Sequence, residues 1–399
     1  RLWMFAAVVA FVPIVAVVTL GPDQAAPVAS CDVLASLALP NGTITGAEAI
    51  EAGAFAPPMR PGRSMSAGQR RQFEALPAFC RVTATLTPSS DSEIKVEVWM
   101  PATGWNGKMH AVGNGAFTGS HRYGSARSLA SGLERGYATA STDTGHEGGS
   151  ASFALGHPEK VIDFGWRAVH EMTVTAKQVI AAFYGSGPEY SYWYGCSAGG
   201  RQAMMEAQRF PGDYDGIIAG APGNDWTGRA AGSLRIANYL GAHEDAGLSA
   251  AKVELVRMAV LEACDAADGV IDKVVGDPER CDFDPAVLQC SGADNGSCLT
   301  AAQVNTVKML YSSPENPKTG RAITGVLPGS ESNWTDLGWT RSARASGLDQ
   351  YRYLVYGDPE WTVDRFDFGT DIVRAEETDG GTLNALDPDL RPFFDRGGK

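Results

Sequence analysis

A serine between glycines is the residue of this sequence best suited to covalent chemistry. Gly195-Cys196-Ser197-Ala198-Gly199 satisfies the pattern G-x-S-x-G. The aromatic run at 190–195 predicts a strand before it, and the periodic segment 198–210 predicts a helix after it. A serine on a sharp strand-to-helix turn exposes its hydroxyl for attack on a carbonyl carbon. This context favours Ser197 as a nucleophile over the alternative, a glycine-rich turn with an inert serine.

Backbone amides at two places are candidates for an oxyanion hole. The amide of Ala198 opens the predicted helix, where the helix dipole favours negative charge. Gly113-Asn114-Gly115 follows a short strand pattern, so the Gly115 amide is the candidate for the second donor. Together these amides would stabilise the negative charge that develops in acyl transfer.

A serine nucleophile needs a histidine base and a carboxylate that orients it. In this architecture the chain order is serine, then Asp or Glu, then histidine. His243 is the one histidine after Ser197, and its polar surroundings favour a surface position. His146 is a candidate to line the site, but its place before the nucleophile argues against a role as base. We therefore expect the triad to be incomplete in residues 1–399, because no histidine there suits the role of base.

Seven cysteines indicate disulfides and an oxidising compartment. Pairing in sequence order gives three bridges: Cys31–Cys80, Cys264–Cys281 and Cys290–Cys298. Cys196, beside the predicted nucleophile, is then left without a partner.

The first 30 residues predict a secretory signal peptide. An apolar run at 3–20 follows Arg1 and precedes small residues. The run is also long enough to span a bilayer, so an uncleaved anchor is the alternative. We expect a secreted or periplasmic protein with no stable membrane partner after cleavage.

Composition and charge narrow the class of protein. A formal net charge of −13 disfavours binding to nucleic acid. With 44% hydrophobic and 20% charged residues, the chain has the balance of a globular protein. A small molecule is therefore the expected partner.

Alternating strand and helix patterns predict an α/β fold. The strand patterns lie at 108–113, 137–141, 190–195 and 215–222, the last expected to be buried, after a hairpin at 81–101. Helical spacing at 166–185 and 198–210 indicates a mostly parallel sheet covered on both faces. From about residue 226 this alternation stops. The expected organisation is a hydrolase core at 31–225, an inserted lid at 226–383, and a return to the core at 384–399.

Four segments resemble the tannase/feruloyl esterase family of secreted serine esterases. They are YGCSAGGRQAMMEAQRFPGDYDGIIAGAPGNDW (194–226), WNGKMHAVGNGAF (105–117), STDTGH (141–146) and FGWRAVHEMTVTAK (164–177). The resemblance covers essentially everything after the signal. It implies an α/β-hydrolase fold with Ser197 as nucleophile and oxyanion donors near Gly115 and Ala198. It also implies that Cys196 is disulfide-bonded to a cysteine directly after the catalytic histidine.

Three aspartates in the predicted lid are candidate calcium ligands. The spacing of Asp265, Asp268 and Asp272 leaves open both a calcium site and a solvated acidic turn. The resemblance implies calcium, held by these three side chains and by the carbonyls of Val270 and Val274. Such an ion would stiffen the lid without joining the chemistry.

Aromatic residues of the lid have two possible uses, core packing or stacking on a phenolic ring. They are Trp334, Trp339, Trp361, Phe366 and Phe368.

The C-terminal segment 387–399 predicts a short helix and a Gly-Gly turn that feeds a strand. The family pattern places the triad aspartate at the end of that strand and a His-Cys pair further on, so we expect these residues beyond Lys399 and the chain to be truncated. The expected activity is hydrolysis of galloyl or hydroxycinnamoyl esters through an acyl-enzyme. The alternatives are a non-catalytic secreted ligand-binding protein and an esterase for alkyl esters or terephthalate monoesters.

Overall fold

The computed structural model describes residues 27–59, 64–335 and 345–399, so most of the predicted signal peptide lies outside the described residues. A seven-stranded sheet with the order β1-β2-β3-β5-β4-β6-β7 forms the centre of the core. The strands are β1 (Gly42–Ile50), β2 (Phe79–Leu86), β3 (Ile94–Pro101), β4 (Lys108–Val112), β5 (Ala138–Thr142), β6 (Tyr190–Cys196) and β7 (Gly216–Gly220).

The sheet is mixed, where the sequence indicated a mostly parallel one. β1, β2, β3 and β5 pair antiparallel, and β5, β4, β6 and β7 pair parallel. The hairpin predicted at 81–101 is confirmed as β2 and β3. The small-residue strand β1 was not predicted, and its pairing with β2 adds to the antiparallel half.

One predicted feature of the sheet is wrong. The segment 215–222 forms β7, but Ile218 on it is 61% exposed. β7 is the last strand in the sheet order, and on its outer side the backbone of Lys399 hydrogen-bonds to Asp215 and Ile217. At this end of the sheet the described residues leave one face of β7 uncovered, and Ile218 is therefore open to solvent.

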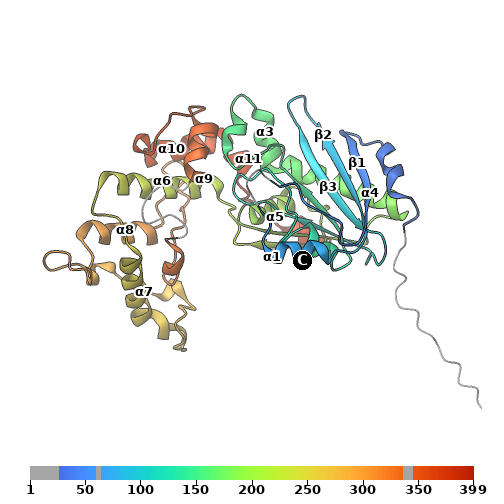
Figure 1. Cartoon of the computed structure of the whole chain (residues 1–399). Helices are drawn as coiled ribbons and strands as arrows, with labels where there is room; N and C mark the ends of the chain where they lie inside the picture. Colours follow the sequence, from blue (N-terminus) through green and yellow to red (C-terminus); the bar gives the residue numbers. More distant parts are fainter. Residues whose placement is uncertain (1–26, 60–63, 336–344) are drawn as a thin grey trace, which may run out of the picture.

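Helices cover both faces of the sheet (Figure 1). α4 and α5 pack on one face through a large apolar cluster, and α1 and α2 pack on the other. The core helices are α1 (Ala67–Glu74), α2 (Leu129–Leu133), α3 (Pro158–Ile162), α4 (Ala168–Tyr184), α5 (Ala198–Arg209) and α12 (Arg391–Asp395). The helices predicted at 166–185 and 198–210 are confirmed as α4 and α5.

Residues 226–383, called the lid unit below, form a helical body at the side of the core, at the left of Figure 1. Its helices are α6 (Trp226–Ala242), α7 (Ala250–Cys264), α8 (Ala301–Tyr311), α9 (Ala345–Asp349) and α10 (Phe368–Ala375), and its last helix, α11 (Gly381–Leu383), lies beside α3 of the core. The chain enters and leaves this body at one place, because the Ala385 amide donates to the Asn224 carbonyl at 2.9 Å. This is the topology of an insertion.

Three disulfides are present, and they are the pairs named from the sequence: Cys31–Cys80, Cys264–Cys281 and Cys290–Cys298. The first fastens the N-terminal segment to β2, and the other two close loops of the lid unit. Among the described helices, none combines the length and apolar character needed to cross a bilayer.

Candidate active site

Ser197 occupies a sharp turn between β6 and α5. Its torsion angles are φ 62° and ψ −118°, a conformation that costs a non-glycine residue about 1–3 kcal/mol. The Ser197 amide donates to the Gly220 carbonyl at 3.0 Å. The Ser197 carbonyl accepts from the amides of Arg201 at 3.0 Å and Gly223 at 3.1 Å. These bonds hold the strained turn, and the serine side chain is exposed.

Glycines beside Ser197 let the backbone segments approach closely. A Cβ at Gly195 would lie 2.2 Å from the carbonyl oxygen of Gly199. A Cβ at Gly200 would lie 2.5 Å from the carbonyl oxygen of Gly220. Both distances are well inside van der Waals contact. Packing against neighbouring backbone therefore requires glycine at these positions.

The two candidate oxyanion donors lie at the start of α5 and after β4. Ala198 is the first residue of α5, so its amide has no carbonyl partner within the helix. Within the described part of the chain, the Gly115 amide donates no hydrogen bond. The loop that carries Gly115 is fixed to α5, because the Asn114 amide donates to Gln202 Oε1 at 3.0 Å. Both amides are thus available to an oxyanion.

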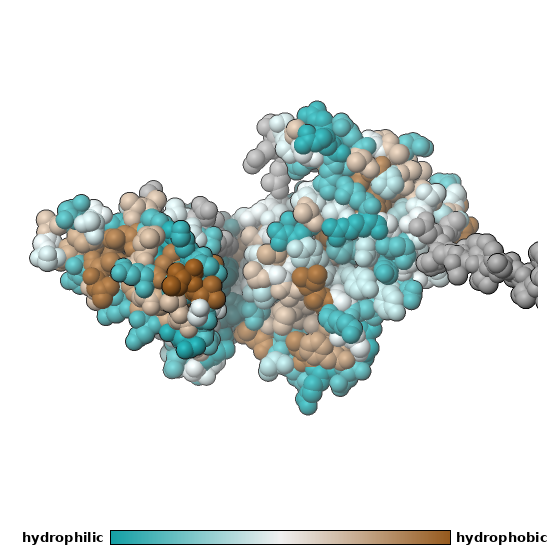
Figure 2. All heavy atoms as spheres, turned by 90° about the horizontal axis from the view of Figure 1, so that it is seen from below, coloured by the Kyte–Doolittle hydropathy of each residue, from teal (hydrophilic) through white to brown (hydrophobic). Residues whose placement is uncertain are grey.

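Ser197 opens into a cavity of about 720 Å³ between the core and the lid unit, called the active-site cavity below. Figure 2 shows the groove between these two bodies from below. The lining includes Ala116, Trp226, Arg235, Met309, Ser312 and Leu386. Apolar walls with a few polar groups are typical of a small-molecule site.

No described histidine lines the active-site cavity. The expectation that His146 lines the site is therefore wrong. Its Nε2 donates to the Phe117 carbonyl at 2.8 Å and its ring stacks on Phe153 at 4.0 Å, which fixes it in the core. Burial lowers the pKa of His146. The predicted surface position of His243 is confirmed, with Nδ1 donating to the Tyr239 carbonyl at 2.9 Å.

A profile of the family described as "Tannase and feruloyl esterase" matches residues 80–399. This chain belongs to the tannase and feruloyl esterase family. Its match to an uncharacterized esterase from Xanthomonas campestris pv. campestris has 39% identity and covers 93% of this chain and 66% of the relative. Its match to feruloyl esterase B from Aspergillus niger has 32% identity and covers 80% of this chain and 61% of the relative. The chain therefore spans less than two thirds of the length of both curated relatives.

Solved structures confirm the α/β-hydrolase fold of this tannase/feruloyl esterase family member. The crystal structure of feruloyl esterase B from Aspergillus oryzae superposes with a TM-score of 0.82 at 29% identity. The match covers 92% of this chain and 72% of that one. Tannin acyl hydrolase from Aspergillus niger has the same fold, with a TM-score of 0.60 at 21% identity over 91% of this chain and 70% of that one.

Cys196 of this family member forms no disulfide with a described cysteine and is half-buried. The Arg127 guanidinium lies 5.8 Å from the centre of the neighbouring Tyr194 ring. A disulfide to a cysteine after the catalytic histidine stays a prediction.

The candidate calcium loop is folded on its own backbone. Asp265 is buried and accepts hydrogen bonds from the amides of Asp272, at 3.2 Å, and Lys273, at 3.0 Å. Asp268 Oδ1 accepts from the Val270 amide at 2.9 Å, and Asp272 Oδ1 accepts from the Val274 amide at 3.1 Å. In the described structure, the carboxylate oxygens of Asp265, Asp268 and Asp272 do not all lie within 4.8 Å of one another. The donor types suit calcium, and the three carboxylates are not gathered around one point.

The lid aromatics pack inside the lid unit. Trp334, Trp361 and Phe366 are buried in its two apolar clusters, and Phe368 packs at the edge of one. None of these four lines the active-site cavity. Trp339 lies outside the described residues. Trp226, which the sequence did not single out, is the tryptophan that lines the cavity.

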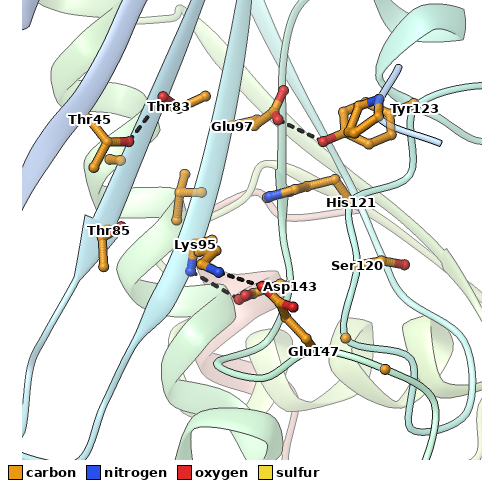
Figure 3. Close-up of a pocket in the computed structure, with 15 residues that line it drawn as sticks. Thr45, Thr83, Thr85, Lys95, Glu97, Ser120, His121, Tyr123, Asp143 and Glu147 are labelled. Carbon is orange, nitrogen blue, oxygen red and sulfur yellow. Dashed lines mark hydrogen bonds and ion pairs between the residues drawn. The ribbon is translucent and has the colours of Figure 1, made fainter. Parts of the chain in front are cut away.

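A second cavity of about 800 Å³ lies against β1, β2 and β3 (Figure 3). Its charged side chains all have hydrogen-bond or ion-pair partners. Lys95 Nζ lies 2.5 Å from Glu147 Oε1, and the Lys95 amide donates to Asp143 Oδ1 at 2.9 Å. Glu97 accepts from the Tyr123 hydroxyl at 2.7 Å. Burial raises the pKa of Asp143 to about 7. Ser197 does not line this cavity, so we assign no chemistry to it.

Proposed function

We propose that the protein hydrolyses carboxylic esters of aromatic acids, of the galloyl or hydroxycinnamoyl type, with Ser197 as nucleophile. One observation carries the proposal: Ser197 stands on a strained strand-to-helix turn at the wall of a partly apolar cavity between core and lid. Membership of the family and the similarity to a protein named feruloyl esterase B support the substrate class.

In the proposed mechanism Ser197 Oγ attacks the ester carbonyl carbon and its proton passes to a base. The carbonyl oxygen takes up negative charge between the amides of Ala198 and Gly115. The alcohol leaves with a proton, and water then releases the acid from the acyl-serine. The base in this mechanism is a histidine, oriented by an aspartate.

Removal of the hydroxyl in the full-length protein tests this mechanism. Ser197→Ala should lower kcat/KM for methyl ferulate by a factor of about 10⁴ or more. Ser186→Ala, at an exposed turn after α4, is the matched control and should behave as the unaltered protein. Retained hydrolysis in Ser197→Ala would remove this serine as nucleophile.

Substrate comparison separates the proposal from its alternatives. Rates on methyl gallate, methyl ferulate and ethyl butyrate should show a preference for the aromatic acids. A preference for the alkyl ester would favour a general esterase. Binding of these esters without turnover would favour a non-catalytic protein.

We also propose a structural calcium ion in the lid unit, held by Asp265, Asp268 and Asp272 with the carbonyls of Val270 and Val274. The support is a set of hard oxygen donors in a loop that a disulfide closes. We compare the melting temperature in a chelator with that in free calcium at roughly 100 times its Kd. The chelator sample should melt about 5 °C lower.

The calcium test has its own control. Asp268→Asn should abolish the chelator effect, and Asp282→Asn, at an exposed aspartate of the same unit, should keep it. An unchanged melting temperature of the unaltered protein in chelator would contradict the site.

Export is the remaining proposal. The three disulfides support a secreted or periplasmic location, since such bridges persist in oxidising compartments.

A further inference from the structure

The active-site cavity is lined by more positive than negative groups, although the chain carries a net charge of −13. Arg229, Arg235 and Arg321 line it, and Asp225 is its one carboxylate among the described lining residues. Arg321 pairs with Asp225 and with Glu376. Burial works against the charge of Arg321, yet these two ion pairs raise its pKa. The charge of Arg321 is therefore compensated within the protein.

Arg235 differs, because none of the ion pairs among the described residues involves it. Its Nη2 donates to the Met309 carbonyl at 2.9 Å and to Ser312 Oγ at 2.8 Å. Its Nε is buried and has no hydrogen-bond partner in the described part of the chain. The ring of Phe368 lies 5.8 Å from its Cζ. Neutral groups thus hold the guanidinium in place without balancing its charge.

A partly buried cation without a counter-ion is unfavourable. Burial lowers the pKa of Arg235, and no acidic group in the described part of the chain opposes that effect. An anion that enters the cavity would supply the missing charge and gain charge-assisted hydrogen bonds. The second cavity offers no such opening, because Lys95 there is already paired with Glu147 (Figure 3).

Arg235 and the nucleophile would contact different parts of one ligand. Trp226 opens α6 beside the serine turn, since a Cβ at Gly223 would lie within 4 Å of both Trp226 and the Ser197 carbonyl. Arg235 is nine residues further along the same helix, about 14 Å at 1.5 Å per residue. A group bound there belongs to a part of the ester away from the reacting carbonyl.

We propose that Arg235 binds a carboxylate carried by the ester substrate, so that the enzyme prefers anionic esters to neutral esters of the same shape. This rests on the proposed esterase function, since it assigns the ester to the cavity that Ser197 opens into. The carboxylate belongs either to the acid part or to the alcohol part of the ester, and the experiment distinguishes these two sources.

Two pairs of substrates test the proposal with the full-length protein. For the acid part, monomethyl terephthalate is compared with methyl 4-carbamoylbenzoate. For the alcohol part, the feruloyl ester of glycolic acid is compared with the feruloyl ester of glycolamide. Within each pair the scissile ester is the same, and a carboxamide of similar shape replaces the carboxylate. Methyl ferulate reports esterase activity independently.

The unaltered protein should show a kcat/KM higher by about 10- to 100-fold for the carboxylate in one of the two pairs. The pair that shows it identifies the part of the ester that carries the anion. Equal rates within both pairs, with methyl ferulate hydrolysed, would overturn this proposal and leave the esterase function standing. Failure to hydrolyse any of the five esters would instead contradict the esterase function.

Variants then assign the preference to Arg235. In Arg235→Gln the ratio of carboxylate to carboxamide rates should fall to about one, and Arg235→Lys should keep part of it. Arg365→Gln removes a half-exposed arginine that pairs with Asp358 outside the cavity, and should keep the full ratio. A full ratio in Arg235→Gln would overturn the assignment. Because the readout is a ratio within one protein, a general loss of activity does not imitate the expected result.

Discussion

The close packing of β6 against α5 at the Ser197 turn requires that residue 195 has no side chain. The substitution Gly195→Ala tests this requirement. The added Cβ would lie 2.2 Å from the Gly199 carbonyl oxygen, 2.4 Å from its carbonyl carbon and 2.8 Å from its Cα. All three are backbone atoms of the first turn of α5, so no side-chain rotation relieves the contact. Reaching 3.0 Å, below which Cβ contacts essentially do not occur, needs a shift of at least about 0.8 Å between β6 and α5.

The size of the effect follows from that shift. Overpacking of this kind costs about 1–3 kcal/mol of folding free energy. A displacement of roughly 1 Å at a reacting group lowers activity by about 100-fold. Gly195→Ala should therefore keep the fold with a reduced melting temperature and lose about two orders of magnitude in kcat/KM for methyl ferulate.

Gly212→Ala is the matched control, since a Cβ at Gly212 meets nothing within 4 Å. Both variants are compared by circular dichroism, thermal melting and ester hydrolysis. A Gly195→Ala protein with unaltered melting temperature and activity within about threefold of the parent would refute the close-packing argument.

Two further predictions concern stability. Burial raises the pKa of Asp143 to about 7, above roughly 3.9 in an unfolded chain, so the folded state keeps a proton that the unfolded state releases. The stability that this group contributes is full below about pH 4 and is lost as pH rises to about 7. In the parent protein the free energy of unfolding should therefore fall by up to about 4 kcal/mol between pH 4 and pH 8 on account of Asp143. Asp143→Asn should remove this part of the fall, as measured by urea unfolding at the two pH values. An unchanged difference between the two pH values would contradict it. Loop lengths rank the disulfides: replacing both cysteines of Cys31–Cys80, 49 residues apart, by serine should cost about 4 kcal/mol, against about 2.5 kcal/mol for Cys290–Cys298, 8 residues apart. Urea unfolding of the two double variants measures both costs, and the reverse order would count against the loop-entropy account.

Features that depend on neighbouring residues were predictable from the sequence. The pattern around Ser197 predicts strand, turn and helix because each is set by local spacing, and all three are present. The hairpin at 81–101 follows from alternation around a polar turn. The order of the cysteines predicts the pairs that the structure contains, and for Cys264–Cys281 and Cys290–Cys298 the reason is local, because the two cysteines are only 17 and 8 residues apart.

What the tertiary structure decided concerns contacts between distant segments. The active-site cavity joins Ser197 of the core to Trp226 and Arg235 of α6 and to Ser312 after α8, and no local pattern marks these residues as neighbours. The lack of a counter-ion for Arg235 among the described residues is a property of packing, since described carboxylates reach Arg321 but not Arg235. Side-chain type limits what chemistry a residue offers. Which charges meet, and which remain unpaired in the active-site cavity, depends on how segments distant in the sequence pack together.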